Sequence, residues 1–100
     1  MSTFYHVTMR SCLPCIMRDG LKPRIPDEPY DYQPAAVYMW RHKGSALAMQ
    51  QPYGDAAVML EVTMLDCLVT EDWEMDSDED GDSNAVKTSR WIPPSAIHIA

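Results

Sequence analysis

The stretch FYHVTMRSCLPCIMRDGLKPR, residues 4–24, predicts a strand, a sharp turn, a short helix and an exit loop. Residues 4–8 are rich in aromatic and β-branched side chains, which favour a strand. Ser11 suits a helix N-cap and Pro14 suits its first turn, while Gly20 can adopt the positive φ that often ends a helix. The stretch also contains four basic residues: Arg10, Arg18, Lys22 and Arg24.

The rest of the chain predicts further short elements. Composition and periodicity favour three strands and one helix, at residues 36–40, 56–65, 96–99 and 45–51 respectively. Apolar residues on both faces of 56–65 indicate a central strand, which residues 67–70 extend or pair with. Four prolines between residues 22 and 34 indicate an extended loop. Together these features predict a single α+β domain over residues 1–100.

The acidity of the chain is concentrated in one segment. The net charge is −7, and residues 71–82 contain eight acids and no base. The excess of negative charge opposes phosphate, so nucleic acid is not expected as a partner of the whole surface. The acidic loop at 71–84 can instead occupy a basic protein surface. One hypothesis is therefore a non-enzymatic interaction or inhibitor protein, of the kind that phages carry, which binds a basic partner through residues 71–82.

Compartment and membrane association follow from the apolar pattern. No apolar run approaches the roughly 18–20 residues of a membrane span, and the N-terminal residues lack the layout of a signal peptide. We therefore expect a cytoplasmic protein without a membrane partner. The three cysteines fit reduced thiols better than a disulfide framework.

Two motifs invite metal or redox chemistry. Residues 76–82 match the first half of a calcium-binding loop, but Lys87 stands where the bidentate glutamate belongs. No four-ligand zinc spacing occurs either, so no metal site is expected. Cys12 and Cys15 form a CxxC motif between a strand and a helix, the usual position of a redox pair. We interpret them as buried packing thiols, with a thiol-redox module as a further hypothesis.

Several ordered motifs resemble the ADP-ribosyltransferase-like superfamily, chiefly its small members akin to RNA 2′-phosphotransferases and DNA-modifying toxins. In that family the first strand carries H-x-T, a short helix ends in Gly-Leu-x-Pro, and a tyrosine-bearing strand follows. The matching residues here are HVT at 6–8, GLKP at 20–23 and Tyr38. The closing Ile-Pro-Pro-x-x-Ile strand of the family resembles IPPSAI at 92–97.

The resemblance implies small split sheets, mixed or antiparallel, that flank an NAD-binding cleft. His6 would then hydrogen-bond a ribose hydroxyl, and the backbone at Val7 and Thr8 would hold the nicotinamide amide. The ring of Tyr38 would lie against the nicotinamide, and the 22–34 loop would cover the dinucleotide. The phosphate contacts would come from basic residues, among them Arg10, Lys22 and Arg24.

The third catalytic residue departs from the family pattern. ADP-ribosyl transfer uses a late glutamate to align the ribose, and this chain has Ser95 near the closing strand. Glu61 is the acid inside a predicted strand, while Glu71 and Glu74 lie at a strand end. The implied catalytic set is therefore His6, Tyr38 and Glu61. The implied function is NAD-dependent ADP-ribosyl or 2′-phosphate transfer, or the binding of NAD or an ADP-ribose-type nucleotide without transfer.

Overall fold

The computed structural model describes residues 1–23, 36–71 and 85–100. Most of the predicted 22–34 loop and of the acidic 71–84 loop therefore lies outside the described residues. Short 3-10 turns join several elements, at Arg10–Cys12, Gln51–Ala56, Asp66–Leu68 and Pro94–Ala96. The strands and helices are β1 (Ser2–Met9), α1 (Leu13–Asp19), β2 (Val37–Trp40), α2 (Lys43–Gln50), β3 (Ala57–Met64), β4 (Thr70–Glu71), β5 (Ala85–Thr88) and β6 (Ile97–Ile99).

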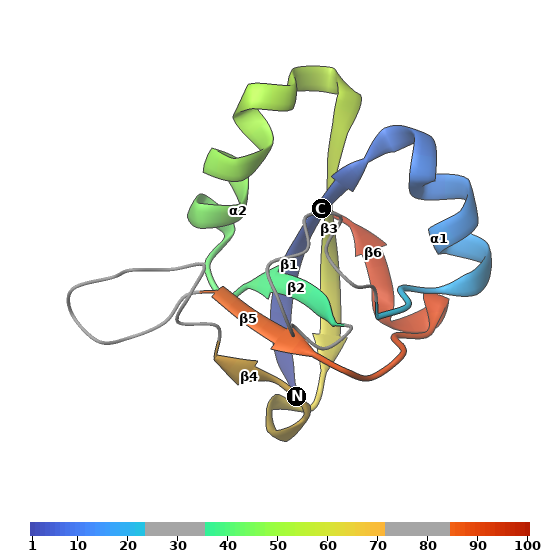
Figure 1. Cartoon of the computed structure of the whole chain (residues 1–100), viewed down its shortest axis with the longest axis vertical. Helices are drawn as coiled ribbons and strands as arrows, with labels where there is room; N and C mark the ends of the chain where they lie inside the picture. Colours follow the sequence, from blue (N-terminus) through green and yellow to red (C-terminus); the bar gives the residue numbers. More distant parts are fainter. Residues whose placement is uncertain (24–35, 72–84) are drawn as a thin grey trace, which may run out of the picture.

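Six strands form one antiparallel sheet in the order β4-β5-β2-β1-β3-β6 (Figure 1). β1 pairs with β3 along its whole length, from Ser2 opposite Met64 to Met9 opposite Ala57. On its other side, β1 pairs with β2 at one register position, Tyr5 opposite Trp40. The split sheets implied by the resemblance are therefore a single sheet here, in which this one register pair joins the two halves.

One face of the sheet carries the main hydrophobic core. Strand alternation places Phe4 and Leu60 on this face, and both side chains are fully buried. Ile16 from α1 covers them, together with Leu21 and Ile92, which pair with each other across a β-bridge. The strand, the helix and a residue just after the helix in the 4–24 stretch therefore all contribute side chains to the same core.

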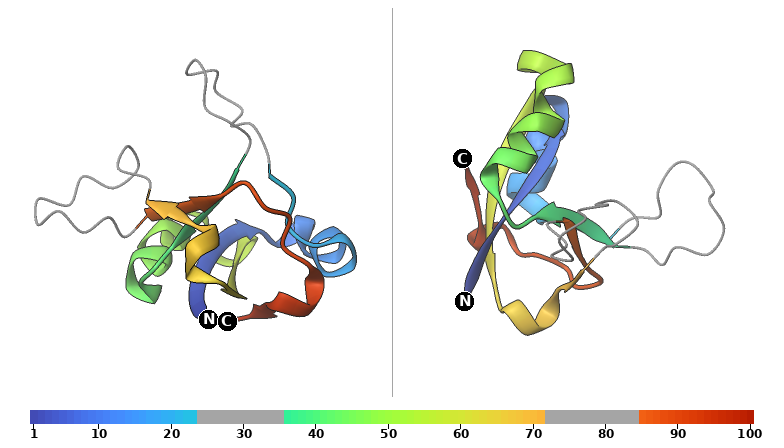
Figure 2. Two further views of the ribbon diagram at one scale, coloured as in Figure 1. Left: turned by 90° about the horizontal axis from the view of Figure 1, so that it is seen from below. Right: turned by 90° about the vertical axis from the view of Figure 1, so that its left-hand side faces the viewer.

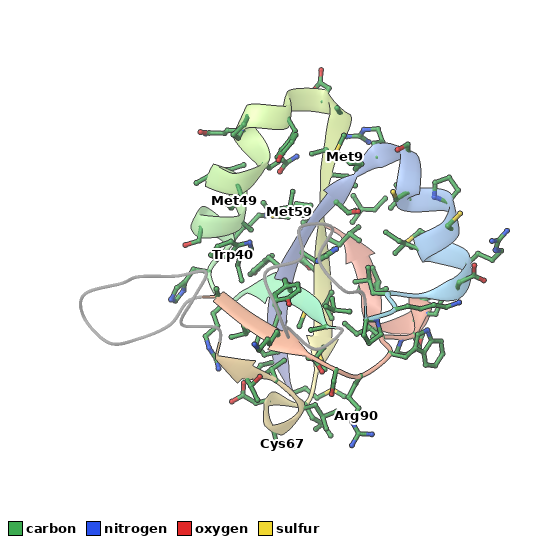
Figure 3. The ribbon with its side chains drawn as sticks, in the orientation of Figure 1. Met9, Trp40, Met49, Met59, Cys67 and Arg90 are labelled. Carbon is green, nitrogen blue, oxygen red and sulfur yellow. The ribbon has the colours of Figure 1, made fainter. Side chains whose placement is uncertain are left out.

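The opposite face of the sheet is covered in part by α2, which packs against β1, β2 and β3. Figures 1 and 2 show α1 and α2 on either side of the β1–β3 pair. Met59 and Trp40, which alternation places on this second face, lie beside α2 in Figure 3. Ala46 is fully buried because its small side chain lets the helix approach closely, whereas Leu47 and Met49 remain about half exposed.

The structure confirms most of the predicted elements, with some differences. The N-cap of α1 is Cys12 instead of the predicted Ser11, and among the described residues no side chain caps this helix end. Residues 67–70 do not extend β3, since the turn Asp66–Leu68 intervenes and β4 pairs with β5 instead. The sequence pattern does not predict β5, because its four residues include alanine and lysine, which strands disfavour. Within the described residues, neither helix combines the length and the apolar character that crossing a membrane requires.

Candidate functional site

The candidate site is built around His6, which lies in β1 next to the position where β1 meets β2. Its Nδ1 lies 2.7 Å from the carbonyl oxygen of Tyr38. Because a carbonyl oxygen can only accept, Nδ1 carries a proton and donates it. Burial lowers the pKa of His6, and the hydrogen bond to Tyr38 opposes this effect only in part. The imidazole is therefore neutral at neutral pH, and its Nε2 is an acceptor.

A cavity of about 510 Å³ adjoins His6, between β1, α1 and the start of β2. Thr8, Ser11 and Lys22 are among the residues that line this cavity, and their side chains carry two hydroxyl groups and an ammonium group. These groups suit a ligand that carries both hydroxyls and an anion. The other lining residues are Cys12, Cys15, Ile16, Asp19, Gly20, Leu21, Ala36, Val37 and Tyr38.

Gly20 turns the chain out of α1, which forms one wall of the cavity. Its φ of 84° confirms the predicted positive value, although its ψ of −176° lies outside the left-handed helical region. A Cβ at this position would overlap the carbonyl group of Ile92. Directly after it, Leu21 and Ile92 exchange two backbone hydrogen bonds of 2.9 Å each. Both the φ value and this close approach therefore require glycine.

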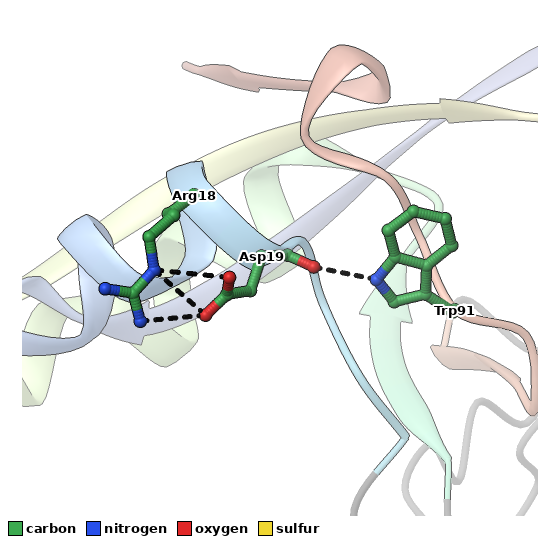
Figure 4. Close-up of polar contacts among 3 residues, drawn as sticks. All are labelled: Arg18, Asp19 and Trp91. Atoms are coloured by element: carbon green, nitrogen blue, oxygen red, sulfur yellow. Dashed lines mark hydrogen bonds and ion pairs between the residues drawn. The ribbon is translucent and has the colours of Figure 1, made fainter.

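Asp19 ties this wall to the chain segment around Trp91 (Figure 4). The indole Nε1 of Trp91 donates a hydrogen bond of 2.8 Å to the Asp19 carbonyl oxygen. Nη2 of Arg18 donates one of 2.9 Å to the Asp19 carboxylate, and this interaction with Arg18 lowers the pKa of the carboxyl. Asp19 is the only acid among the described residues that line the cavity, and Arg18 already engages it.

The structure brings together four of the predicted site residues at one cavity and separates others. His6, Thr8 and Lys22 line the same cavity, and Tyr38 lines it as well. Val7 does not line the cavity, and its side chain points to the other face of the sheet, whereas the role expected of its backbone stays a prediction. Arg10 does not line the cavity, because its Nε donates a 3.0 Å hydrogen bond to the carbonyl oxygen of Asp55. Arg24 lies outside the described residues.

Tyr38 contributes its backbone, not its ring, to the surroundings of His6. Its neighbours Val37 and Met39 are buried in the core on the His6 face. Strand alternation therefore directs the Tyr38 ring to the other face, where Lys87 is its cross-strand neighbour. The expectation that this ring flanks a nicotinamide beside His6 is corrected for that reason.

Glu61 also lies on the face opposite to His6. In the β1–β3 register Glu61 pairs with Tyr5, whereas His6 pairs with Leu60. On its other side Glu61 pairs with His98 of β6. Since side chains alternate between faces, the carboxylate of Glu61 cannot align a ribose that His6 holds. Its predicted catalytic role beside His6 is therefore corrected as well.

A second and larger cavity, of about 680 Å³, lies beside the start of β1. Its lining is mainly apolar, with Arg90 and His98 among the polar residues, and it contains none of the predicted site residues. Within the described parts of the chain, no cluster of three His, Cys, Asp or Glu residues is arranged to hold a metal ion. The His6 cavity is the better candidate, because it joins a neutral, oriented imidazole to hydroxyl groups and a cation.

Sequence reasoning missed Ser11, Cys12 and Cys15 as residues of the cavity. The CxxC motif is the signal in the sequence that points to the two cysteines, since it places both thiols where a strand meets a helix. No protein-family model and no curated protein matches the chain. The function is therefore inferred from the chemistry of the cavity.

Proposed function

We propose that this chain binds a nucleotide of the NAD or ADP-ribose type in the His6 cavity. The observation that carries the proposal is the hydrogen bond from Nδ1 of His6 to the Tyr38 carbonyl, 2.7 Å long, on an imidazole kept neutral by burial. Its Nε2 can accept a hydrogen bond from a ribose hydroxyl. Thr8 and Ser11 line the same cavity, and their hydroxyls can pair with the second ribose hydroxyl.

The charges around the cavity suit a phosphate group. Lys22 is exposed and lines the cavity, so its ammonium can donate a charge-assisted hydrogen bond to a phosphate oxygen. The Asp19 carboxylate would repel phosphate, but Arg18 forms an ion pair with it at 2.9 Å. Two cations therefore face one carboxylate at this wall. The local charge favours an anion although the whole chain is acidic.

The proposal is binding without ADP-ribosyl transfer. Transfer passes through a positively charged, oxocarbenium-like state, which a nearby carboxylate stabilises. Glu61 lies on the other face of the sheet, and Asp19 is already paired with Arg18. Neither carboxylate is placed to stabilise a charge that develops on a ribose beside His6.

Titration with NAD, followed by amide and imidazole NMR signals, tests where the nucleotide binds. We expect shifts concentrated at His6, Thr8, Ser11 and Lys22, with ADP-ribose giving the same pattern. Shifts confined to Arg90 and Trp91, at the second cavity, would contradict the proposed site. No shifts at millimolar NAD would contradict the proposed function.

A second candidate is the binding of a basic protein partner through residues 71–82. One observation favours it: β4 pairs with β5, with Thr70 opposite Lys87 and Glu71 opposite Val86. The two strands that flank the acidic segment are thus held side by side at the edge of the sheet. We expect that changing Asp76, Asp78, Asp80 and Asp82 to Asn abolishes capture of a basic protein in a pull-down, whereas Asp55→Asn does not. Unchanged capture by the fourfold variant would remove this candidate.

A further inference from the structure

The two thiols of the Cys12-Leu13-Pro14-Cys15 motif are more accessible than packing thiols. Cys15 is exposed, Cys12 is half-buried, and both are free thiols that line the His6 cavity. Cys12 does pack partly against the core, as expected, but the interpretation of Cys15 as a buried residue is wrong. Nucleotide binding as proposed above uses neither thiol.

The local backbone brings these two thiols close to each other. Cys12 ends the 3-10 turn Arg10–Cys12, with φ −85° and ψ −12°, and α1 begins at the next residue. Side chains three apart in an α-helix have Cβ atoms roughly 5–6 Å apart, and in a 3-10 helix they eclipse. A disulfide needs a Cβ separation of about 3.5–4.5 Å. Cys12 lies where the 3-10 turn meets α1. A small tightening of this turn would therefore bring the two Cβ atoms into the range that a disulfide needs.

We propose that Cys12 and Cys15 form a reversible dithiol–disulfide site, oxidised by a low-molecular-weight disulfide of the glutathione type. The thiolate of exposed Cys15 attacks the oxidant, whose S–S bond breaks and releases one thiolate. The thiolate of Cys12 then attacks the Cys15 sulfur of the mixed disulfide and releases the second thiolate. The two cysteines lose two electrons and two protons, and the oxidant leaves as two thiols.

The disulfide would form in the wall of the cavity that contains His6. Oxidation therefore alters the surroundings of the imidazole, even when no nucleotide is present. If the folded backbone holds the thiols together, the disulfide forms more readily in the folded chain than in the unfolded chain. The equilibrium constant for closing the disulfide is then larger in the folded chain than in the unfolded chain. By linkage, the disulfide raises the equilibrium constant for folding by the ratio of these two closure constants.

Equilibration with mixtures of reduced and oxidised glutathione tests the proposal. The experiment uses a Cys67→Ser variant as its parent protein. This change removes the third thiol, which lies in the turn Asp66–Leu68 and does not line the cavity. After acid quenching, mass spectrometry separates the dithiol, the glutathione adduct and the closed disulfide, which has lost two hydrogen atoms. We expect the equilibrium constant for closure to be at least about tenfold larger in the folded protein than in urea, or about 1.4 kcal/mol.

Two further results are expected. Adding Cys12→Ser or Cys15→Ser should leave only a glutathione adduct, and the His6 ring signals should shift when the parent protein is oxidised. Equal closure constants with and without urea would overturn the proposal, as would glutathione adducts alone in the folded protein or unchanged His6 signals. No nucleotide is used, so the result is independent of the proposed nucleotide binding.

Discussion

His6 has one imidazole nitrogen committed to the fold, and the other is the acceptor that we propose for a ligand. Nδ1 donates to the Tyr38 carbonyl at 2.7 Å, and burial lowers the pKa of the ring. A neutral ring with Nδ1 protonated leaves Nε2 as an acceptor, which a ribose hydroxyl can use. Because burial lowers the pKa of His6 in the folded state, the stability of the fold depends on pH.

We predict that the free energy of unfolding falls when the pH drops below about 6.5, the ordinary pKa of histidine. The unfolded chain binds a proton on His6 more readily than the folded chain does, because the folded pKa is lowered. The stability that depends on a neutral His6 is therefore complete above about pH 6.5 and is lost as the pH falls toward the lowered pKa of the folded state. Urea denaturation over this pH range measures it. In His6→Asn, whose amide can replace Nδ1–H but does not titrate, the fall should be smaller; an equal fall would contradict this account.

Gly20 is the residue for which the backbone allows no side chain. Gly20→Ala should destabilise the protein by at least about 2 kcal/mol, because φ is positive and the Cβ would overlap the Ile92 carbonyl. Chemical denaturation measures the change. Gly44→Ala is the matched control, since it lies in α2 with open space around it and should stabilise by roughly 0.5 kcal/mol. A Gly20→Ala variant as stable as the wild type would refute the close approach.

At the level of the elements, strand alternation decides which predicted residues can act together. His6 and Thr8 share one face of β1, whereas Glu61 in β3 lies on the other face. Lys22, just after α1, lines the cavity with the first two. The 4–24 stretch thus supplies most of the candidate site, and β2 contributes mainly the carbonyl that orients His6.

We predict that Lys22→Gln weakens NAD binding several-fold, because it removes a charge-assisted hydrogen bond to phosphate. Calorimetry at low salt measures the affinity. Lys87→Gln removes the same charge from β5, on the other face of the sheet, and should leave the affinity unchanged. Glu61→Gln should also have no effect. Equal losses in the two lysine variants would point to a general charge effect and would contradict the proposed site.

Much of this arrangement can be predicted from the sequence, and the remainder has identifiable causes. The strand with His6, the short helix and the Gly20 stop are local features, and the structure confirms them. The face on which Tyr38 lies is not local: VYMW at 37–40 is apolar on both faces. Only pairing with β1 and β5 shows which face joins the core.

At the scale of the whole molecule, contacts distant in sequence close the structure around the 4–24 stretch. The hydrogen bond from Trp91 to Asp19 joins residues 72 positions apart, and the Leu21–Ile92 bridge lies beside it. Sequence patterns do not reveal such contacts, because neither partner determines the other locally. The segment that resembles the closing strand of the family thus also packs against the exit of α1.

We predict that Trp91→Phe lowers the free energy of unfolding by about 1 kcal/mol, the typical contribution of one hydrogen bond. Phenylalanine retains an aromatic ring but cannot donate to the Asp19 carbonyl, which now accepts a 2.8 Å hydrogen bond. Denaturant titration of both proteins measures the difference. Identical stability would mean that the indole N–H contributes nothing to holding α1 against the 91–97 segment.

The most direct test of the central claim is calorimetric titration of the wild-type chain and His6→Ala with NAD. His6→Ala removes the imidazole whose Nε2 is the proposed acceptor, and circular dichroism verifies that the variant is folded. We predict measurable heat with the wild type at millimolar NAD or below, and an affinity about tenfold weaker in the variant. No heat above background for the wild type, or equal affinities in the two proteins, would contradict the claim.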